Sequence, residues 1–391
     1  MTKVLMIASQ DIVNDLSDGG KHGSNRNWNL LCDVFGRENV WLIEFDKATR
    51  NGNAGTDIDD HILSLCPFHS IIDRALCILS GNFFENPHCD IRIVNCINQF
   101  NIDLVFIDRT LFGNLTGKIK KHTHAKIWLF SHNLEKDYVA NKFRSNVLLS
   151  KLMSHVAFLS ERKAVALCDK LFALTERDSH SYLELYKKKA DYIIPTSFDD
   201  RFDESKLINI GQNVYIQPSK ELLFIGSCFN ANYDGIKWFV DNVMPSLPDY
   251  TLRIVGKNFE IKKKELERDN VDVIGTVGDL EPFYYADNIM VMPIFYGAGQ
   301  KVKTAEAMMY GKTIIATEEA LEGYSVTDIE GIHKCRTSTD FISAIQYEEM
   351  RPKQKYNYSV RDFFVSRFSY EVVSQQMQVI AVENLLLPEC K

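Results

Sequence analysis

The residues best suited to chemistry in this sequence lie close together, between positions 297 and 306. Gly297 and Gly299 allow a tight turn in which the backbone can approach a ligand closely. Lys301 and Lys303 follow at the expected start of a helix, where N–H groups and the helix dipole favour an anion. Glu306 is placed to accept hydrogen bonds from the hydroxyl groups of a sugar. The pattern predicts a site for an anionic, hydroxyl-bearing ligand; the simpler interpretation is a pair of solvated lysines.

The neighbouring residues predict the elements that hold this turn. Residues 288–293 (NIMVMP) form a short apolar run before it, as expected for a buried strand of a parallel sheet. Apolar side chains then recur at helical spacing between positions 302 and 309, and Gly311 follows as a C-cap. A strand, a glycine turn and a helix N-terminus in this order predict an anion site at the end of the strand.

The stretch 293–311 (PIFYGAGQKVKTAEAMMYG) resembles the donor-site signature of retaining glycosyltransferase family 4, G-x-G-x-[RK]-x-K-x-x-E-A-M-A-x-G-x-P. This family includes the group 1 glycosyltransferases of bacterial polysaccharide biosynthesis. The resemblance implies the α/β fold called GT-B, in which two Rossmann-like, doubly wound parallel-sheet domains face each other across a cleft. It also implies that Lys301 and Lys303 bind the donor diphosphate and that Glu306 binds the nucleotide ribose.

The sequence departs from the family's pattern in the donor site. Ala298 stands where the family often has a second glutamate, so the group that faces the donor sugar stays open. Residues 230–235 (NANYDG) lack the phosphate-binding Arg or Lys of many members, which leaves Asn232 as a candidate contact. Lys301 and Lys303 must then carry more of the diphosphate charge.

A second polar cluster, H-N-x-E at positions 132–135, follows the apolar run 126–130. A lone histidine is more often structural than catalytic, but this one leaves a strand end, where open α/β sheets bind ligands. The cluster resembles an H-N-x-E element of many family 4 enzymes, in which the histidine faces the donor sugar and diphosphate. This resemblance makes His132 a catalytic candidate, which would position the donor and stabilise charge on the leaving group. Asn133 and Glu135 could equally cap the following helix.

Two further glycine turns complete the candidate donor site. A polar loop is expected at residues 17–26, before a helix that starts near position 24, and the family has its phosphate-facing glycine loop there. An ordinary loop is the alternative, because the dinucleotide spacing G-x-G-x-x-G is missing. The second turn follows the apolar run 221–225. With His132 and Glu306 as the catalytic candidates, the expected donor-binding residues are Gly19, Gly20, Gly226, Ser227, Asn232, Gly297, Ala298, Gly299, Lys301, Lys303 and Glu306.

The chain of 391 residues is long enough for two domains. Short apolar runs alternate with helical patterns in both halves, which predicts two parallel sheets. We expect an acceptor domain at 1–200, a donor domain at 201–365, and a C-terminal helix at 366–391 that packs back on the first domain. Within the first domain, residues 62–100 are expected to be mostly helical and residues 135–167 to form one amphipathic helix.

Charge, cysteine content and short motifs limit the partners, the cellular location and the cofactors that we expect for this protein. The net charge of −7 argues against general nucleic-acid binding, but residues 118–189 carry 15 basic and 7 acidic residues. This region is either a solvated face or a surface for anionic lipid or an anionic acceptor. Nine scattered cysteines without metal-binding spacing, and an N-terminus without a signal peptide, predict a cytoplasmic protein. The basic region leaves open a peripheral position at the inner face of the membrane. No D-x-D motif lies at a predicted strand end, since residues 57–59 fall in a polar loop, so no metal or other cofactor is expected.

We therefore expect a glycosyltransferase that moves a sugar from a nucleotide diphosphate-sugar to a saccharide or lipid-linked saccharide, with retention of configuration. Two alternatives stay open. One is a nucleotide-sugar epimerase of the same fold, which would need a catalytic carboxylate that the sequence does not single out. The other is a non-catalytic partner subunit, which Ala298 and the segment 230–235 leave possible.

Overall fold

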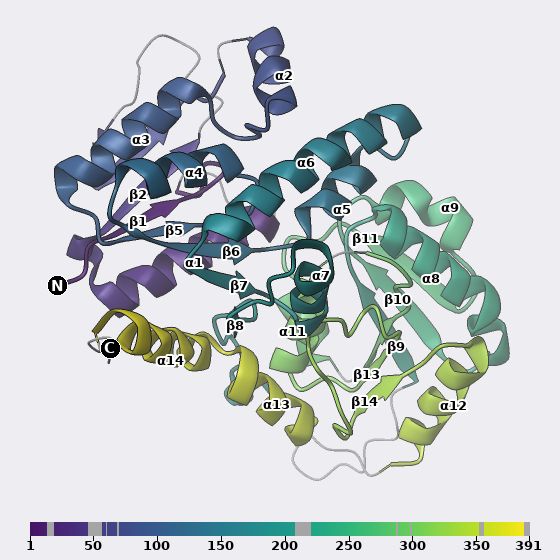
Figure 1. The fold of residues 1–391 in the computed structure, drawn as a ribbon. Coiled ribbons are helices and arrows are strands. Elements are labelled where there is room, and N and C mark those ends of the chain that lie inside the picture. The colour runs from purple at the N-terminus through teal and green to yellow at the C-terminus, as the bar shows by residue number, and fades with distance from the viewer. Residues whose placement is uncertain are drawn as a thin grey trace. The chain divides into compact units, whose positions relative to one another are not determined.

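The computed structural model describes residues 1–13, 19–45, 57–59, 61–68, 70–207, 220–286, 288–297, 299–351 and 356–386. The chain forms two compact units (Figure 1). The first unit contains Met1–Thr196 and Val373–Lys391, and the second contains Ser197–Val372.

The first unit is built on a sheet with the strand order β3-β4-β2-β1-β5-β6-β7-β8. Every pair of neighbours is parallel except β3 and β4, which are antiparallel at the edge of the sheet. The inner strands are short apolar runs that are buried along nearly their whole length, as expected for a sheet covered on both faces. The strands are β1 (Val4–Ile7), β2 (Val40–Phe45), β3 (Asp57–Asp59), β4 (Ile62–Leu65), β5 (Leu104–Ile107), β6 (Lys126–Ser131), β7 (Lys170–Ala173) and β8 (Tyr192–Ile193).

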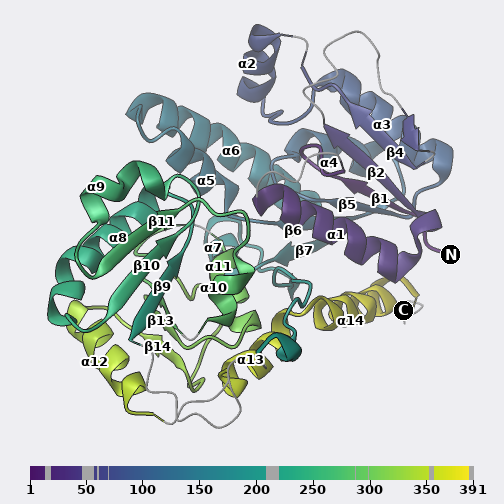
Figure 2. The same ribbon diagram turned by 180° about the vertical axis from the view of Figure 1, so that it is seen from behind.

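Helices cover both faces of this sheet. Four helices, α3, α4, α6 and α7, pack against one face, and α1 lies on the other (Figure 2). Side-chain caps start several of them; Thr175, for example, accepts a hydrogen bond from the backbone N of Asp178. The helices are α1 (Gly19–Phe35), α2 (Ile71–Leu79), α3 (Pro87–Phe100), α4 (Gly113–His122), α5 (Glu135–Lys142), α6 (Val147–Leu167) and α7 (Glu176–Tyr186).

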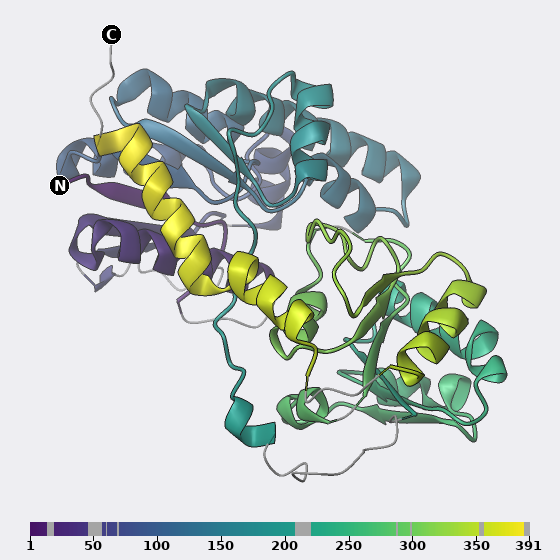
Figure 3. The same cartoon turned by 90° about the horizontal axis from the view of Figure 1, so that it is seen from below.

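The C-terminal segment ends in the first unit, beyond α14 (Tyr370–Ala381) (Figure 3). Asn384 holds it there, because its side chain donates to the hydroxyl of Tyr192 at 2.8 Å. The carbonyl of Asn384 also accepts a hydrogen bond of 2.9 Å from Lys126 Nζ, at the start of β6.

The second unit contains an all-parallel sheet with the order β11-β10-β9-β12-β13-β14. Its strands are β9 (Glu221–Ile225), β10 (Thr251–Val255), β11 (Val271–Gly275), β12 (Ile289–Met292), β13 (Ile314–Ala316) and β14 (Ile332–Lys334). Its helices are α8 (Asn230–Asn242), α9 (Lys263–Leu266), α10 (Glu281–Tyr285), α11 (Val302–Met309), α12 (Ser338–Glu349) and α13 (Tyr358–Phe368). In sequence order the strands run 3-2-1-4-5-6, which is the Rossmann arrangement.

Some local predictions were wrong. Residues 57–59 form the edge strand β3 instead of a loop, and residues 62–65 form β4 instead of a helix. Helix α1 begins at Gly19, earlier than expected, and residues 143–146 separate α5 from α6 where one helix was predicted. Within the described residues, no helix is long and apolar enough to cross a membrane.

Candidate functional site

The strand order of the second unit reverses between β9 and β12, and open α/β sheets bind ligands at such a reversal. The turn Gly226-Ser227 follows β9, and Gly297 and Gly299 lie beyond β12, before α11. Gly299 has a φ of 65°, a conformation that glycine adopts without strain. These glycine turns of the second unit therefore lie at the carboxyl edge of this sheet.

Glu306 is the centre of a charged cluster in α11. Its side chain is 12% exposed. One carboxylate oxygen accepts hydrogen bonds from Lys303 Nζ at 2.6 Å and from the Tyr284 hydroxyl at 2.7 Å. The other lies 3.5 Å from the guanidinium of Arg201. Burial, and then the charge of Glu306, raise the pKa of Tyr284, so this hydroxyl stays a hydrogen-bond donor. These contacts hold the carboxylate of Glu306 between the cationic groups of Lys303 and Arg201.

Lys301 occupies the N-cap position of α11. Its ammonium group lies 2.8 Å from a carboxylate oxygen of Glu319 and donates to the carbonyl of Gly299 at 2.9 Å. The side chain is only 15% exposed. This geometry argues against the simple interpretation of two solvated lysines. The ammonium group of Lys301 is largely shielded from solvent, and two hydrogen bonds hold it in a defined position.

The turn after β9 is held by Asn232. Its side-chain amide donates to the carbonyl of Ser227 at 2.9 Å, and the residue is buried in the first turn of α8. A Cβ atom at Gly226 would lie 2.6 Å from the amide nitrogen of Asn232, so a larger residue there would displace this side chain. Asn232 thus orients the turn, while Ser227 is exposed. Ala298, the remaining candidate of this unit, lies outside the described residues.

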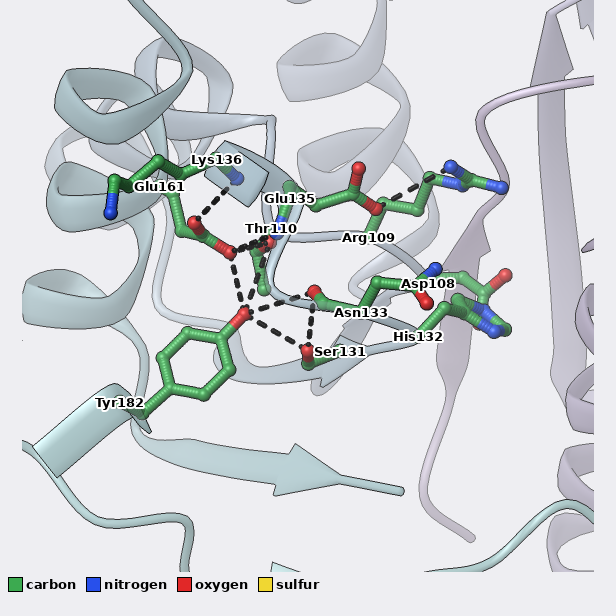
Figure 4. Close-up of polar contacts among 10 residues, drawn as sticks. All are labelled: Asp108, Arg109, Thr110, Ser131, His132, Asn133, Glu135, Lys136, Glu161 and Tyr182. Atoms are coloured by element: carbon green, nitrogen blue, oxygen red, sulfur yellow. Dashed lines mark hydrogen bonds and ion pairs between the residues drawn. The ribbon is translucent and has the colours of Figure 1, made fainter. Parts of the chain in front are cut away.

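The first unit carries a second cluster at the carboxyl ends of β5 and β6 (Figure 4). His132 Nε2 lies 2.9 Å from Asp108 Oδ1, and the side-chain amide of Asn27 donates to the same oxygen at 2.6 Å. Asp108 is completely buried, whereas the imidazole of His132 is 11% exposed. A Cβ at Gly23 would lie 3.4 Å from the imidazole, which places α1 beside it. The ring of His132 is therefore held by a carboxylate at Nε2, and its Nδ1 and Cε1 atoms lie close to Gly23 of α1.

Two of the glycine candidates lie in α1. Gly19 and Gly20 form the start of this helix instead of the expected loop. Gly19 lies one helical turn before Gly23, the residue beside the imidazole of His132. The structure thus brings the first turn of a helix close to the end of the first unit's sheet where His132 lies.

Arg109 and Glu135 form a buried ion pair in the same cluster. Arg109 Nη1 lies 3.4 Å from Glu135 Oε1, with side chains 12% and 1% exposed. Burial raises the pKa of Glu135, and the guanidinium of Arg109 acts against this rise. Neither Asn133 nor Glu135 caps α5, because the N-cap is Leu134, which makes no side-chain capping hydrogen bond.

Glu161 ties the cluster together from α6. Its fully buried carboxylate accepts hydrogen bonds from the hydroxyls of Thr110, Tyr182 and Tyr186, at 2.6, 2.5 and 2.7 Å. It also accepts the backbone N–H groups of residues 135 and 136, at 3.2 and 3.3 Å. The Tyr182 hydroxyl lies 2.9 Å from the hydroxyl of Ser131, the residue before His132. Glu161 therefore holds the segment that carries His132 from both of its ends (Figure 4).

The sequence analysis missed Glu161 and Tyr182. A signal for Glu161 was present, because it lies on the apolar stripe of its helix, between Ala157 and Ala164. A carboxylate on a buried helix face must be paired, so this position pointed to a polar cluster.

Among the described residues, no group of three or more His, Cys, Asp or Glu side chains is arranged to hold a metal ion. The polar residues gathered at the two sheets are instead lysines, an arginine and a histidine, each paired with a carboxylate.

Comparison with known proteins identifies the domain that contains the Glu306 cluster. Residues 219–346 match the sequence profile of the family described as "Glycosyl transferases group 1". These residues form a group 1 glycosyltransferase domain. The match includes every donor-site candidate of the second unit, and the resemblance noted in the sequence is confirmed. The prediction of a sugar-transferring enzyme is confirmed with it.

Solved structures show that this glycosyltransferase has the GT-B fold, as predicted. Sucrose-phosphate synthase from Thermosynechococcus elongatus is similar, with a TM-score of 0.70 and 16% identity over 98% of this chain and 99% of that one. The Anabaena protein HepE in complex with UDP has a TM-score of 0.65 and 12% identity over 98% and 100%. WaaG, a glycosyltransferase involved in lipopolysaccharide biosynthesis, has a TM-score of 0.62 and 14% identity over 96% and 99%. A search of curated proteins by sequence found no match.

Proposed function

We propose that this glycosyltransferase uses a nucleoside diphosphate-sugar as donor, and that the Glu306 cluster binds the nucleotide. The observation that carries the proposal is the pairing of Glu306 with Lys303, beside the half-buried turn that holds Lys301. This arrangement lies at the strand-order reversal of a group 1 glycosyltransferase domain. HepE was solved in complex with UDP, which makes uridine the first base to test.

The charges of the site suit a diphosphate. A leaving diphosphate carries about two to three negative charges, and the N-terminus of α11 supplies roughly half a positive charge. Lys301 and Lys303 supply two more at the same helix end. We propose that they neutralise the leaving group and that turnover needs no added metal. Glu306 would accept hydrogen bonds from the ribose hydroxyls. The backbone would approach the phosphates closely at the glycine turns, which are Gly297, Gly299 and Gly226-Ser227.

We propose that His132 acts in the transfer step. Its imidazole is oriented by Asp108 and is 11% exposed, and an oriented imidazole can hydrogen-bond to a sugar or stabilise charge on a leaving group. Gly19 and Gly20 are proposed as phosphate contacts at the N-terminus of α1. The acceptor would be a saccharide or a lipid-linked saccharide, and the reaction would retain configuration.

We also propose that the protein works in the cytoplasm and contacts an anionic membrane peripherally. The support is the excess of positive charge in residues 118–189, in a chain whose overall charge is −7. Each Lys or Arg near an anionic bilayer contributes about 1 kcal/mol, and salt weakens the attraction.

Isothermal titration calorimetry with uridine, guanosine, adenosine and thymidine diphosphates tests the donor site, in buffer containing EDTA. Lys301→Ala should weaken binding of the preferred diphosphate by about tenfold or more, because a charge-assisted bond contributes about 1.5–3 kcal/mol. Glu306→Gln should also weaken binding of the diphosphate, because it removes the charge that strengthens the hydrogen bonds from the ribose hydroxyls. Lys237→Ala, which removes a lysine paired with Asp241 on the outer side of α8, is the matched control and should bind as wild type.

Three outcomes would contradict the proposal. Weak and equal heats for all four diphosphates would argue against a nucleotide site. Wild-type affinity in both site variants would place the site elsewhere. Binding and sugar transfer that appear only when EDTA is replaced by Mg²⁺ or Mn²⁺ would contradict the metal-independent mechanism.

A further inference from the structure

Two helices of the first unit expose an unusual number of large apolar side chains. Single exposed apolar residues are normal, but a contiguous group marks a binding surface. Ile71 and Leu148 are each 82% exposed. We call the whole group the α2–α6 face; it consists of Ile71, Ile72, Leu76 and Leu79 of α2, and Val147, Leu148, Leu149, Leu152 and Leu159 of α6.

The two helices hold each other in place through other residues. Ile78 of α2 packs against a small core formed by Leu111, Val139, Met153 and Ala157, which lies between α5 and α6. The exposed residues of α2 are thus turned away from this contact. Helix α2 touches α6, and both α2 and the first turns of α6 lie on the upper side of Figure 1. The face is a fixed surface, and no described segment of the chain covers it.

Positive charges are mixed with these apolar residues. Between positions 138 and 168 the only acidic residue is Glu161, which is buried and bonded inside the unit. All other charged residues of this segment are basic and exposed. They are Lys142, Arg144, Lys151, Arg162 and Lys163. Leucines among lysines and arginines, without acids, are typical of helices that lie in the interface of an anionic bilayer.

A cavity of about 300 Å³ opens between α5 and α6 next to Leu148 and Leu152. The hydroxyls of Ser150 and Ser154 donate to backbone carbonyls of α5, so they brace the wall. No acidic residue lines the cavity, whereas two lysines and a histidine do. Its lining residues are Lys136, Ala140, Ser150, Lys151, Ser154, His155 and Phe158.

We propose that the α2–α6 face docks on an anionic lipid bilayer and that the cavity receives the phosphate of one lipid head group. The leucines and isoleucines enter the interface, and Lys151 and His155 reach the head-group phosphate from the rim of the cavity. This inference rests on the proposed peripheral membrane contact and names the surface that makes it. A protein partner fits less well, because every exposed charged residue between positions 138 and 168 is basic.

Co-sedimentation with vesicles tests the inference. Vesicles of phosphatidylcholine with phosphatidylglycerol should bind the protein, and phosphatidylcholine alone should not. Lys151→Ala should weaken binding about fivefold, the effect of one interfacial charge. The double variant Leu148→Ser with Leu152→Ser should weaken it by at least about tenfold, because two large apolar side chains lose their burial.

Matched controls separate the face from the rest of the surface. Leu183→Ser removes an exposed leucine of α7 and Lys264→Ala an exposed lysine of α9, and both should bind vesicles as wild type does. Sodium phosphate at millimolar concentration, with ionic strength held constant, should compete weakly, since it supplies the phosphate without the bilayer.

The outcomes distinguish the face from the broader membrane proposal. No binding, or equal binding to neutral and anionic vesicles, would overturn the membrane contact itself. Anionic binding that the Leu148/Leu152 and Lys151 variants leave intact would overturn the α2–α6 face alone. A wild-type dimer that the leucine variant converts to a monomer, seen by light scattering, would identify the face as an interface between copies and overturn the inference. Nucleotide calorimetry is independent of all three results.

Discussion

Replacing Glu161 by Gln tests whether the buried network holds the His132 segment. The carboxylate accepts five hydrogen bonds, three at Oε1 and two at Oε2. Glutamine keeps the shape but offers one acceptor oxygen, and its amide nitrogen faces donors at the other position. If the oxygen takes the Oε1 position, the Tyr186 hydroxyl can rotate to accept from the amide. The backbone N–H of Lys136 can only donate a hydrogen bond, so it loses its acceptor.

The energetic cost follows from this count. Hydrogen bonds to a charged group contribute about 1.5–3 kcal/mol each, and neutral ones about 0.5–1.5 kcal/mol. An N–H group left buried without an acceptor costs a further 1–3 kcal/mol or so, again as an order of magnitude. After rotation of the hydroxyls, a net loss of about 3–5 kcal/mol is reasonable for Glu161→Gln. For a domain of this size that loss lowers the melting temperature of the first unit by about 10 °C.

Differential scanning calorimetry, together with initial rates of sugar transfer, measures both consequences. The rate should fall at temperatures below unfolding, because the segment from Ser131 to Lys136 loses its anchor, while nucleotide affinity in the second unit stays unchanged. Tyr186→Phe is the matched control: it removes one donor and should cost roughly 1.5–3 kcal/mol with little loss of rate. If Glu161→Gln melts within about 2 °C of wild type and keeps its rate, the reasoning about this network is refuted.

Three further predictions concern single side chains. His132→Ala should lower transfer by about two to three orders of magnitude with little change in melting temperature, and an unchanged rate would mean a structural histidine. Burial raises the pKa of Glu135, so the folded state keeps this proton to higher pH than the unfolded chain, and wild-type stability should fall as pH rises from about 4.5 through the raised pKa. Glu135→Gln should flatten that part of a melting-temperature profile recorded from acid to neutral pH; an identical slope would contradict the assignment. Tyr284→Phe removes a hydrogen bond to the charged Glu306 and should lower the unfolding free energy of the second unit by about 1.5–3 kcal/mol in urea denaturation, whereas wild-type stability would show that the bond contributes little.

The strand-and-turn pattern of the sequence was sufficient to predict two doubly wound parallel sheets. Residues 288–293 and the helix beyond them were predicted well, because a buried strand, a glycine turn and an apolar stripe leave little choice. Gly311, with a φ of 59°, ends α11 as expected from its position. By contrast, β3 and β4 were missed: residues 57–59 are polar and sit at an edge, and a four-residue apolar run such as 62–65 is ambiguous between strand and helix.

In the candidate site, too, the residues that are close in sequence were predicted and those brought together by the fold were missed. Lys301, Lys303 and Glu306 are close in sequence, so helical spacing alone placed them together. Glu161 and Tyr182 meet Thr110 and Ser131 only through the fold, over separations of about fifty residues that no local pattern encodes. Long-range polar networks of this kind depend on which helix crosses which strand, and the sequence analysis had no means to derive that.

The carboxylates beside the two lysines affect how the enzyme would exchange ligands. Lys301 and Lys303 each lie within hydrogen-bond distance of a carboxylate, Glu319 and Glu306 respectively. If these lysines bind the donor as proposed, an incoming phosphate has to compete with an internal anion for each ammonium group. A single monoanion gains little from such an exchange, whereas a diphosphate engages both lysines at once, so inorganic phosphate and chloride should inhibit poorly. After transfer, the same carboxylates would form their ion pairs with the lysines again as the nucleotide leaves. This would favour rapid release of the nucleotide product.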